Sequence, residues 1–269
     1  MTHMIRSALA AVTAVICLST AFAEEPDGDD IWPKLRQGLF GDRVVEEGDE
    51  ARLKLDLPTR AFDAGIVPLG IRYQALPGDA GLRKLYLVID QNPSPVGAIF
   101  EFGPPRSGIE FETRVRVEDY TWVRVIAERA DGSLVSTRRF IKASGGCSAP
   151  AGKTIAERME GIGKIKWRMD GGTVPDARRA VQLIIRHPNI SGLAMDQLTR
   201  LYDPAVFVNH VRVTQDDSLV FSAQIDFTIS ENPAFRFTLP PGGGDDLHAE
   251  VTDTDGRVFE STYRITGHD

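Results

Sequence analysis

Leu219-Val-Phe-Ser-Ala-Gln-Ile-Asp-Phe-Thr-Ile229 decides the fold class, because apolar residues occupy every second position of this stretch. The positions between them are mostly polar, so the pattern predicts a strand with one buried face and one solvated face. Ala51-Arg-Leu-Lys-Leu-Asp-Leu57 shows the same alternation in the first half of the chain. Both halves are therefore predicted to be built from strands.

Further strand-like runs fill both halves of the chain. The runs span 66–73, 84–90, 96–102, 109–117, 121–128 and 134–142 in the first half, and 180–187, 206–214, 234–239, 247–252 and 257–265 in the second. Turn residues such as Pro77-Gly78, Gly103-Pro104-Pro105 and Asp131-Gly132 separate the runs. This spacing predicts an all-β protein with two immunoglobulin-like antiparallel β-sandwich domains, each with its own packed core, and a small barrel is the alternative.

The first 23 residues have the pattern of a cleaved secretory signal. Arg6 precedes an apolar run over 8–18 that is too short to span a bilayer, and Ala21-Phe-Ala23 supplies small residues for a signal peptidase. A lipoprotein site at Cys17 is the alternative, although Ile16 stands where that site needs a small residue. Cleavage after Ala23 would leave 246 of the 269 residues, with no later apolar stretch of membrane-spanning length. We therefore expect a periplasmic protein without a membrane span.

Composition divides the chain further. We expect a signal peptide at 1–23, an N-terminal segment with a short helix at 24–50 and a first sandwich at 51–142. A cysteine arm with a linker follows at 143–178, and a second sandwich at 179–269. Asp30 is placed to cap a helix over 32–40. Small residues over 143–152 predict a flexible, exposed, glycine-rich arm, and Thr154-Ile-Ala-Glu157 has capping-box spacing for a short helix in the linker over 153–178.

Cys147 is the single thiol of the mature chain, because Cys17 leaves with the signal. An intramolecular disulfide is therefore impossible. About ten flexible residues around Cys147 would have a span on the order of 17 Å, enough to present the sulfur to a partner. We predict Cys147 as the covalent attachment point of a carried group. The flexible arm is assigned to Gly145, Gly146, Ser148 and Gly152.

Other interpretations of Cys147 are an incidental linker thiol or a thiol that forms an intermolecular disulfide. Lys142 and Lys153 flank it, but no His or Asp lies within a few residues. Nothing local therefore predicts a strongly lowered thiol pKa relative to the ordinary value of about 8.5. Activation of the sulfur would have to come from a partner.

The remaining motifs indicate no catalytic residue, metal site or cofactor. Asp253-Thr-Asp-Gly256 is similar to part of a calcium loop, but Val251 stands where the first carboxylate belongs, so a hairpin turn is the preferred interpretation. The histidines are scattered, and neither a phosphate loop nor a nucleophile elbow is present. The net charge of −7, or −8 without Arg6, offers no electrostatic reason to bind nucleic acid.

Several motifs resemble the sulfur-oxidation (Sox) carrier, whose SoxY and SoxZ subunits would here be fused in one chain. The SoxY-like motifs are Ala64-Gly-Ile-Val-Pro-Leu69, Asn92-Pro-Ser-Pro-Val96, Thr113-Arg-Val-Arg-Val117 and Gly145-Gly-Cys147. The SoxZ-like motifs are His187-Pro-Asn-Ile-Ser-Gly192, Ser230-Glu-Asn-Pro233, Phe235-x-Phe237 and Asp253-Thr-Asp-Gly256. Gly145-Gly-Cys147 is the most specific of them, and together they cover nearly all of the mature chain.

The resemblance implies a pair of sandwiches with Cys147 as a swinging-arm anchor for sulfur intermediates. The family usually ends in a free Gly-Gly-Cys-Gly-Gly, whereas Ser148-Ala149 follows Cys147 here and the chain continues into the second domain. Asn189 and Ser191 replace the methionine and threonine of the family pattern. The fusion and the segment 32–43 resemble the SoxYZ-like carriers associated with quinoprotein (pyrroloquinoline quinone) alcohol dehydrogenases.

The resemblance therefore implies a periplasmic carrier rather than an enzyme. Its expected partners are periplasmic redox enzymes, either Sox-type enzymes or a quinoprotein dehydrogenase and cytochrome c, and its expected cargo is a small sulfur intermediate bound covalently. The alternative is a non-covalent accessory module that docks on a quinoprotein dehydrogenase or a cytochrome, with an incidental thiol. A thiol peroxidase is a third interpretation, but the residues that would activate the sulfur are missing.

Overall fold

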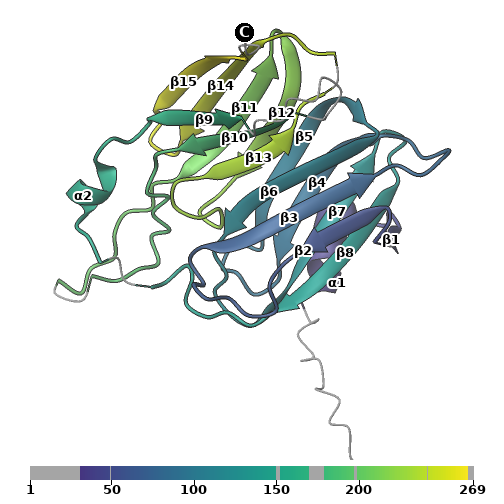
Figure 1. Ribbon diagram of the computed structural model, residues 1–269. Coiled ribbons are helices and arrows are strands. Elements are labelled where there is room, and N and C mark those ends of the chain that lie inside the picture. The colour runs from purple at the N-terminus through teal and green to yellow at the C-terminus, as the bar shows by residue number, and fades with distance from the viewer. Residues whose placement is uncertain are drawn as a thin grey trace, which may run out of the picture.

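Two β-sheets packed face to face form the body of the protein (Figure 1). The structure, a computed structural model, describes residues 31–48, 50–149, 152–169, 179–196, 199–240 and 242–265. The predicted signal peptide lies outside the described residues. Within them, no helix combines the length and the apolar composition needed to cross a membrane.

In the part of the first half that the structure describes, the chain forms one helix and eight strands. They are α1 (Trp32–Phe40), β1 (Val45–Glu47), β2 (Leu53–Asp56), β3 (Val67–Gln74), β4 (Leu82–Ile89), β5 (Val96–Arg106), β6 (Gly108–Val115), β7 (Thr121–Arg129) and β8 (Leu134–Ile141). The second half contains α2 (Ile155–Met159), β9 (Ile165–Met169), β10 (Ala180–Ile185), β11 (Val208–Gln215), β12 (Ser218–Ile225), β13 (Ala234–Thr238), β14 (Asp246–Asp253) and β15 (Val258–Arg264).

Each sheet runs without interruption through both halves of the chain. The larger sheet has the order β1-β8-β7-β4-β5-β12-β11-β14-β15, and the smaller has the order β2-β3-β6-β13-β10-β9. The halves meet where β5 pairs with β12 and where β6 pairs with β13, both antiparallel. We call these two pairings the seam. They give hydrogen-bond partners to strand edges that two separate sandwiches would leave open.

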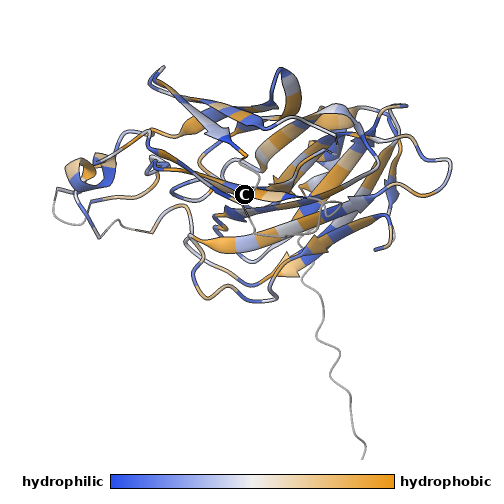
Figure 2. Cartoon of the chain, turned by 45° about the horizontal axis from the view of Figure 1, so that its top comes forward, coloured by the Kyte–Doolittle hydropathy of each residue, from blue (hydrophilic) through white to orange (hydrophobic). Residues whose placement is uncertain are grey.

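One hydrophobic core lies between the sheets and crosses the seam. Phe100 and Phe111 come from the first half, and Phe221 and Phe235 come from the second. The ring centroids of Phe100 and Phe111 are 4.6 Å apart, and those of Phe111 and Phe221 are 5.5 Å apart. The all-β prediction with two immunoglobulin-like sandwiches is confirmed, but the expectation of two separate cores was wrong. Figure 2 shows the apolar and polar residues alternating along the strands.

The structure corrects three local predictions. The segment 153–178 was assigned to a linker, but it contains β9, which pairs with β10. Gly103-Pro104-Pro105 was assigned to a turn, but β5 continues to Arg106. The three-residue strand β1, which runs parallel to β8, was not predicted. The predicted helix over 32–40 is present as α1, and the capping box of Thr154 and Glu157 opens α2.

A third layer covers the outer face of the larger sheet. Phe40 of α1 packs edge-on against Tyr86, with ring centroids 5.0 Å apart, and also joins a cluster with Ile126. The guanidinium of Arg124 lies 4.6 Å from the ring centroid of Trp32 and pairs with the fully buried Asp90. Covering by α1 explains why nearly every residue of β7 is buried.

The shared core predicts that both halves unfold together. Phe221→Ala removes an aromatic ring that packs against Phe100 and Phe111, so we expect a loss of about 3–5 kcal/mol in the free energy of unfolding. Phe62→Ala is the matched control, because Phe62 is fully exposed and its loss should change stability by less than about 0.5 kcal/mol. Urea unfolding followed by both tryptophan fluorescence and circular dichroism measures the effect. Two separate transitions in the wild-type protein would contradict the shared core.

Candidate carrier site at Cys147

Cys147 lies in the loop that follows β8, at one end of the seam. Only 3% of the residue is exposed, and no disulfide partner is present among the described residues. The prediction of an exposed thiol was therefore wrong for this conformation. The loop folds back into the protein because its backbone finds hydrogen-bond partners there.

Glu118, in the segment after β6, holds the cysteine loop in place. Its Oε2 accepts hydrogen bonds from the backbone N–H of Cys147 at 2.8 Å and of Ser148 at 3.1 Å. Its Oε1 accepts a hydrogen bond from the Ser148 hydroxyl. Three donors converge on one carboxylate, and hydrogen bonds to a charged acceptor are stronger than those between neutral groups.

The two glycines before Cys147 allow the backbone to pack closely. Gly145 has φ +77° and donates its N–H to the carbonyl of Glu118 at 2.7 Å. A Cβ on Gly146 would lie 2.1 Å from the carbonyl oxygen of Ala64, so only glycine fits. Of the predicted arm residues, Gly146 is closely packed, and Gly145 and Ser148 are hydrogen-bonded to Glu118. The Cβ positions of Gly145 and Gly152 have no neighbour within 4 Å.

The second half of the chain completes the site. The Ser191 hydroxyl donates a hydrogen bond to the carbonyl oxygen of Cys147 at 2.6 Å. Arg116 comes from the first half and is 8% exposed, and its guanidinium donates to the carbonyls of Ile229 at 3.0 Å and Pro188 at 3.4 Å. The cysteine loop is therefore held by both halves at once.

The surroundings of the thiol favour its protonated form. Burial, followed by the negative charge of Glu118, raises the pKa of Cys147 to about 12, and the nearby Arg116 opposes this only in part. Burial also lowers the pKa of the Arg116 guanidinium. At neutral pH the sulfur in this conformation is a shielded thiol rather than a nucleophilic thiolate.

Two family models match the two halves of the chain that meet at the seam. The model of sulfur oxidation protein SoxY matches residues 36–147, and the model of sulphur oxidation protein SoxZ matches residues 168–264. The chain is a SoxYZ-like fusion. Proteins of these families are carriers in sulfur oxidation, and the SoxY match ends at Cys147 itself.

Other comparisons add little. No curated protein matches the chain. Among solved structures, a β-glycosidase from Bacteroides vulgatus is 8% identical over 81% of this chain and 25% of its own, with a TM-score of 0.24. A glycosyl hydrolase family 2 member from Bacteroides cellulosilyticus DSM 14838 is 10% identical over 78% of this chain and 28% of its own, with a TM-score of 0.20. The chain spans only about a quarter of the length of these enzymes.

The His187 motif of the SoxZ-like domain supports the cysteine loop. His187 is fully buried, its Nδ1 accepts the N–H of Asn189 at 3.0 Å, and its Nε2 lies 3.4 Å from Asp253. Burial lowers the pKa of His187, although Asp253 opposes this shift. Asn189, at φ +44°, donates to the carbonyl of Ile229. These contacts fix the segment that carries Ser191 and indicate a structural role for the histidine.

The Asp253 motif forms a hairpin turn. Asp253 Oδ1 accepts the N–H groups of Asp255 and Arg257, each at 3.0 Å, where β14 turns into β15. The guanidinium of Arg257 also pairs with Asp253. The hairpin interpretation is therefore confirmed. In the described ranges, no three His, Cys, Asp or Glu residues gather as a metal site would require.

The sequence predictions missed Glu118 and Arg116 as parts of the site. Glu118 is 29 residues before Cys147, and Arg116 is two residues before Glu118. Arg116 lies within the quoted SoxY-like motif 113–117, which was the only available signal. Neither spacing nor composition connects these side chains with the cysteine.

Removing the charge of Glu118 should expose the thiol. Glu118→Gln weakens three hydrogen bonds, and a bond to a charged group contributes about 1.5–3 kcal/mol, so we expect N-ethylmaleimide to label Cys147 at least about tenfold faster. Asp119→Asn is the matched control, because Asp119 is the exposed neighbour and bonds only the N–H of Tyr120. Equal labelling rates in wild type and Glu118→Gln would contradict the role of Glu118.

The raised pKa of Cys147 predicts a pH dependence of the same labelling. The pKa is about 12 in the closed loop and about 8.5 in an exposed thiol. The protonated thiol therefore stabilises the closed loop fully below about pH 8.5, and this contribution is lost as the pH rises towards 12. Labelling of the folded protein should keep rising above pH 9, whereas labelling of the urea-unfolded protein levels off. Coincident pH profiles for the two forms would contradict the shift.

Proposed function

We propose that this chain is a periplasmic carrier that holds a sulfur-containing intermediate covalently on Cys147 and presents it to partner enzymes. The observation that supports this most strongly is the position of Cys147. It ends the SoxY match and is bound by Ser191 of the SoxZ-like domain. Both family elements therefore meet at one residue, Cys147. The signal-like pattern of the first 23 residues supports the proposed periplasmic location.

The closed loop protects the sulfur, and transfer begins when the loop opens. In an exchange with a persulfide donor, the Cys147 thiolate attacks the outer sulfur, a new S–S bond forms, the donor's S–S bond breaks and the donor leaves as a thiolate. This exchange has no net oxidation. With a sulfur oxyanion such as thiosulfate, the thiol loses its proton and two electrons pass to a partner cytochrome as the S–S bond forms.

Arg116 suits a charged adduct. Its guanidinium is buried, its positive charge acts on Cys147, and it donates hydrogen bonds to backbone carbonyls. A negatively charged sulfur group on Cys147 would offset part of the cost of burying this cation.

The proposed partners are periplasmic redox enzymes. Sox-type enzymes fit the two families, and a quinoprotein alcohol dehydrogenase with cytochrome c fits the resemblance of the fused arrangement and of segment 32–43. In the structure this segment is α1 and its C-terminal turn, packed on the larger sheet. It is distant in the fold from the face formed by the smaller sheet.

The burial of Cys147 favours a second candidate function. A thiol that is 3% exposed and has a pKa raised to about 12 is also what a non-covalent accessory module would contain. In that function the paired sandwiches dock on a dehydrogenase or cytochrome, and the sulfur only fills space.

Intact-mass analysis of the protein isolated from its native periplasm separates the two functions. A carrier should show a fraction of chains whose mass is raised by sulfur atoms or a sulfur oxyanion, and Cys147→Ser should abolish both this fraction and growth on the sulfur compound or alcohol. Ser218→Ala, at an exposed position of β12, is the matched control and should retain the adduct, since it leaves the cysteine loop unchanged. An unmodified thiol in every sample, together with normal oxidation by the Cys147→Ser strain, would exclude the carrier function and leave the accessory module.

A further inference from the structure

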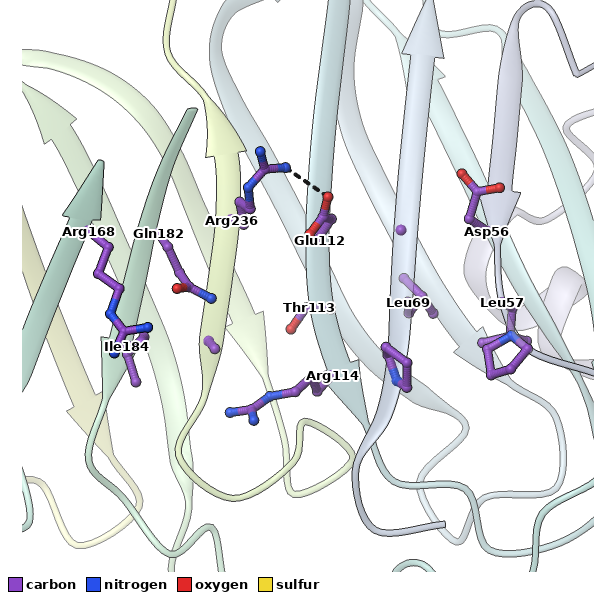
Figure 3. A pocket seen from close by; sticks show the side chains of 14 residues that line it. Asp56, Leu57, Leu69, Glu112, Thr113, Arg114, Arg168, Gln182, Ile184 and Arg236 are labelled. Atoms are coloured by element: carbon purple, nitrogen blue, oxygen red, sulfur yellow. Dashed lines mark hydrogen bonds and ion pairs between the residues drawn. The ribbon is translucent and has the colours of Figure 1, made fainter. Parts of the chain in front are cut away.

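The outer face of the smaller sheet contains a groove that crosses the seam. The groove has a volume of about 790 Å³, and residues from β2, β3, β6, β13, β10 and β9 line it (Figure 3). Its floor follows one cross-strand row of paired positions. The row consists of Asp56, Gly70, Glu112, Arg236, Gln182 and Arg168.

Small residues hollow the groove. Gly70 has no side chain, and Ala234 contributes only a methyl group between the longer side chains of its neighbours. Arg114 and Arg168 extend over the hollow from β6 and β9, on either side of β13 and β10 (Figure 3). Pro68 and Leu57 provide an apolar end in the SoxY-like domain. The groove is therefore apolar at one end and cationic at the other.

The charge of this face is opposite to that of the whole chain. Six cationic and three acidic side chains project from its strands, a net of +3, whereas the chain carries −7. The cations are Lys54, Arg72, Arg114, Lys166, Arg168 and Arg236, and the acids are Asp56, Glu110 and Glu112. Opposite net charge on one face indicates a surface for an acidic partner.

Ion pairs within the face use every acid and leave the cations in excess. Lys54 pairs with Asp56, Arg72 with Glu110 and Arg236 with Glu112. Over the described ranges no carboxylate pairs with Arg114, Lys166 or Arg168. Arg114 donates only to the carbonyl of Asn232, at 2.8 Å. Lys166 and Arg168 lie at the SoxZ-like end of the sheet, on β9, and Arg114 lies at the seam, on β6.

We propose that this groove is the docking site for an acidic, extended segment of a partner protein, whose carboxylates pair with Arg114, Lys166 and Arg168 while apolar side chains contact Leu57 and Pro68. The size of the face suits a transient contact. Six strands about 4.8 Å apart and about five residues long cover about 400 Å², which is below the area of a stable interface. A carrier that visits several enzymes needs an interface of this weak class.

The groove lies close to the cysteine loop. Arg114 is four residues before Glu118, a separation of at most about 13 Å along an extended chain. The segment of Asn232 accepts from Arg114, and Ile229 in the same segment accepts from Arg116. A partner in the groove would therefore stand beside the loop that holds Cys147. This docking site would serve the proposed carrier function, but binding in the groove does not depend on the thiol of Cys147.

Fluorescence anisotropy with a labelled synthetic peptide, Glu-Leu-Glu-Pro-Asp-Leu-Glu, tests the docking site. We expect binding at low ionic strength that weakens as salt is raised. The double variant Lys166→Glu/Arg168→Glu should bind at least about tenfold more weakly, because it reverses two of the excess charges. Lys34→Glu/Arg212→Glu has the same net charge change on exposed positions of the other face and should bind like wild type.

Three results would overturn the proposal. One is wild-type binding that does not prefer this peptide to its counterpart with lysines in place of the acids. Another is an equal loss of binding in both double variants. The third is displacement of the peptide by millimolar thiosulfate or sulfate, which would indicate a pocket for small anions instead. Cys147→Ser should bind the peptide normally, so that failure of the carrier function and failure of the docking site give different results.

Discussion

The pairing of β5 with β12 and of β6 with β13 is the constraint on which the rest of the structure depends. It joins two sandwiches into two continuous sheets and places four phenylalanines from both halves in one core. It also fixes what meets at the end of the seam. There the segment after β6, with Arg116 and Glu118, lies against the SoxZ-like loop of Ser191, and the cysteine loop fills the space between them.

A small number of strong hydrogen bonds holds the cysteine loop in place. Glu118 and Ser191 make four hydrogen bonds to residues 147 and 148, and the thiol adds burial but no ion pair of its own. Backbone hydrogen bonds from Gly145 to Glu118 and from Gly146 to Val117 also hold the loop. The close approach of Gly146 to the carbonyl of Ala64 leaves no room for a side chain, so the backbone of the loop fits in one position there.

Alternation along single strands made most of the fold predictable, because it reports which face of a strand is buried. It does not report which strand lies alongside, and so the seam and the shared core were not foreseen. The sequence of β9, Ile165-Lys-Trp-Arg-Met169, alternates as well. It was not predicted as a strand because glycines at 161, 163 and 171–172 flank it and indicated a linker. The identity of Cys147 was readable from its uniqueness, whereas its burial depended on Glu118, a residue 29 positions away.

Tethering at both ends limits how far Cys147 can travel. Lys142 still bridges to the first domain, at Arg60, and beyond the cysteine α2 is tied to the SoxZ-like domain by the ion pair of Arg158 with Asp203. Cys147 is five positions after Lys142 in the chain, which allows a reach of at most about 18 Å. In the proposed carrier function, a free-ended arm could enter a deep cleft, whereas this tethered arm requires the partner's reactive group to come to the end of the seam. The surface that positions the partner therefore matters more in the fused chain than in a carrier whose arm ends freely.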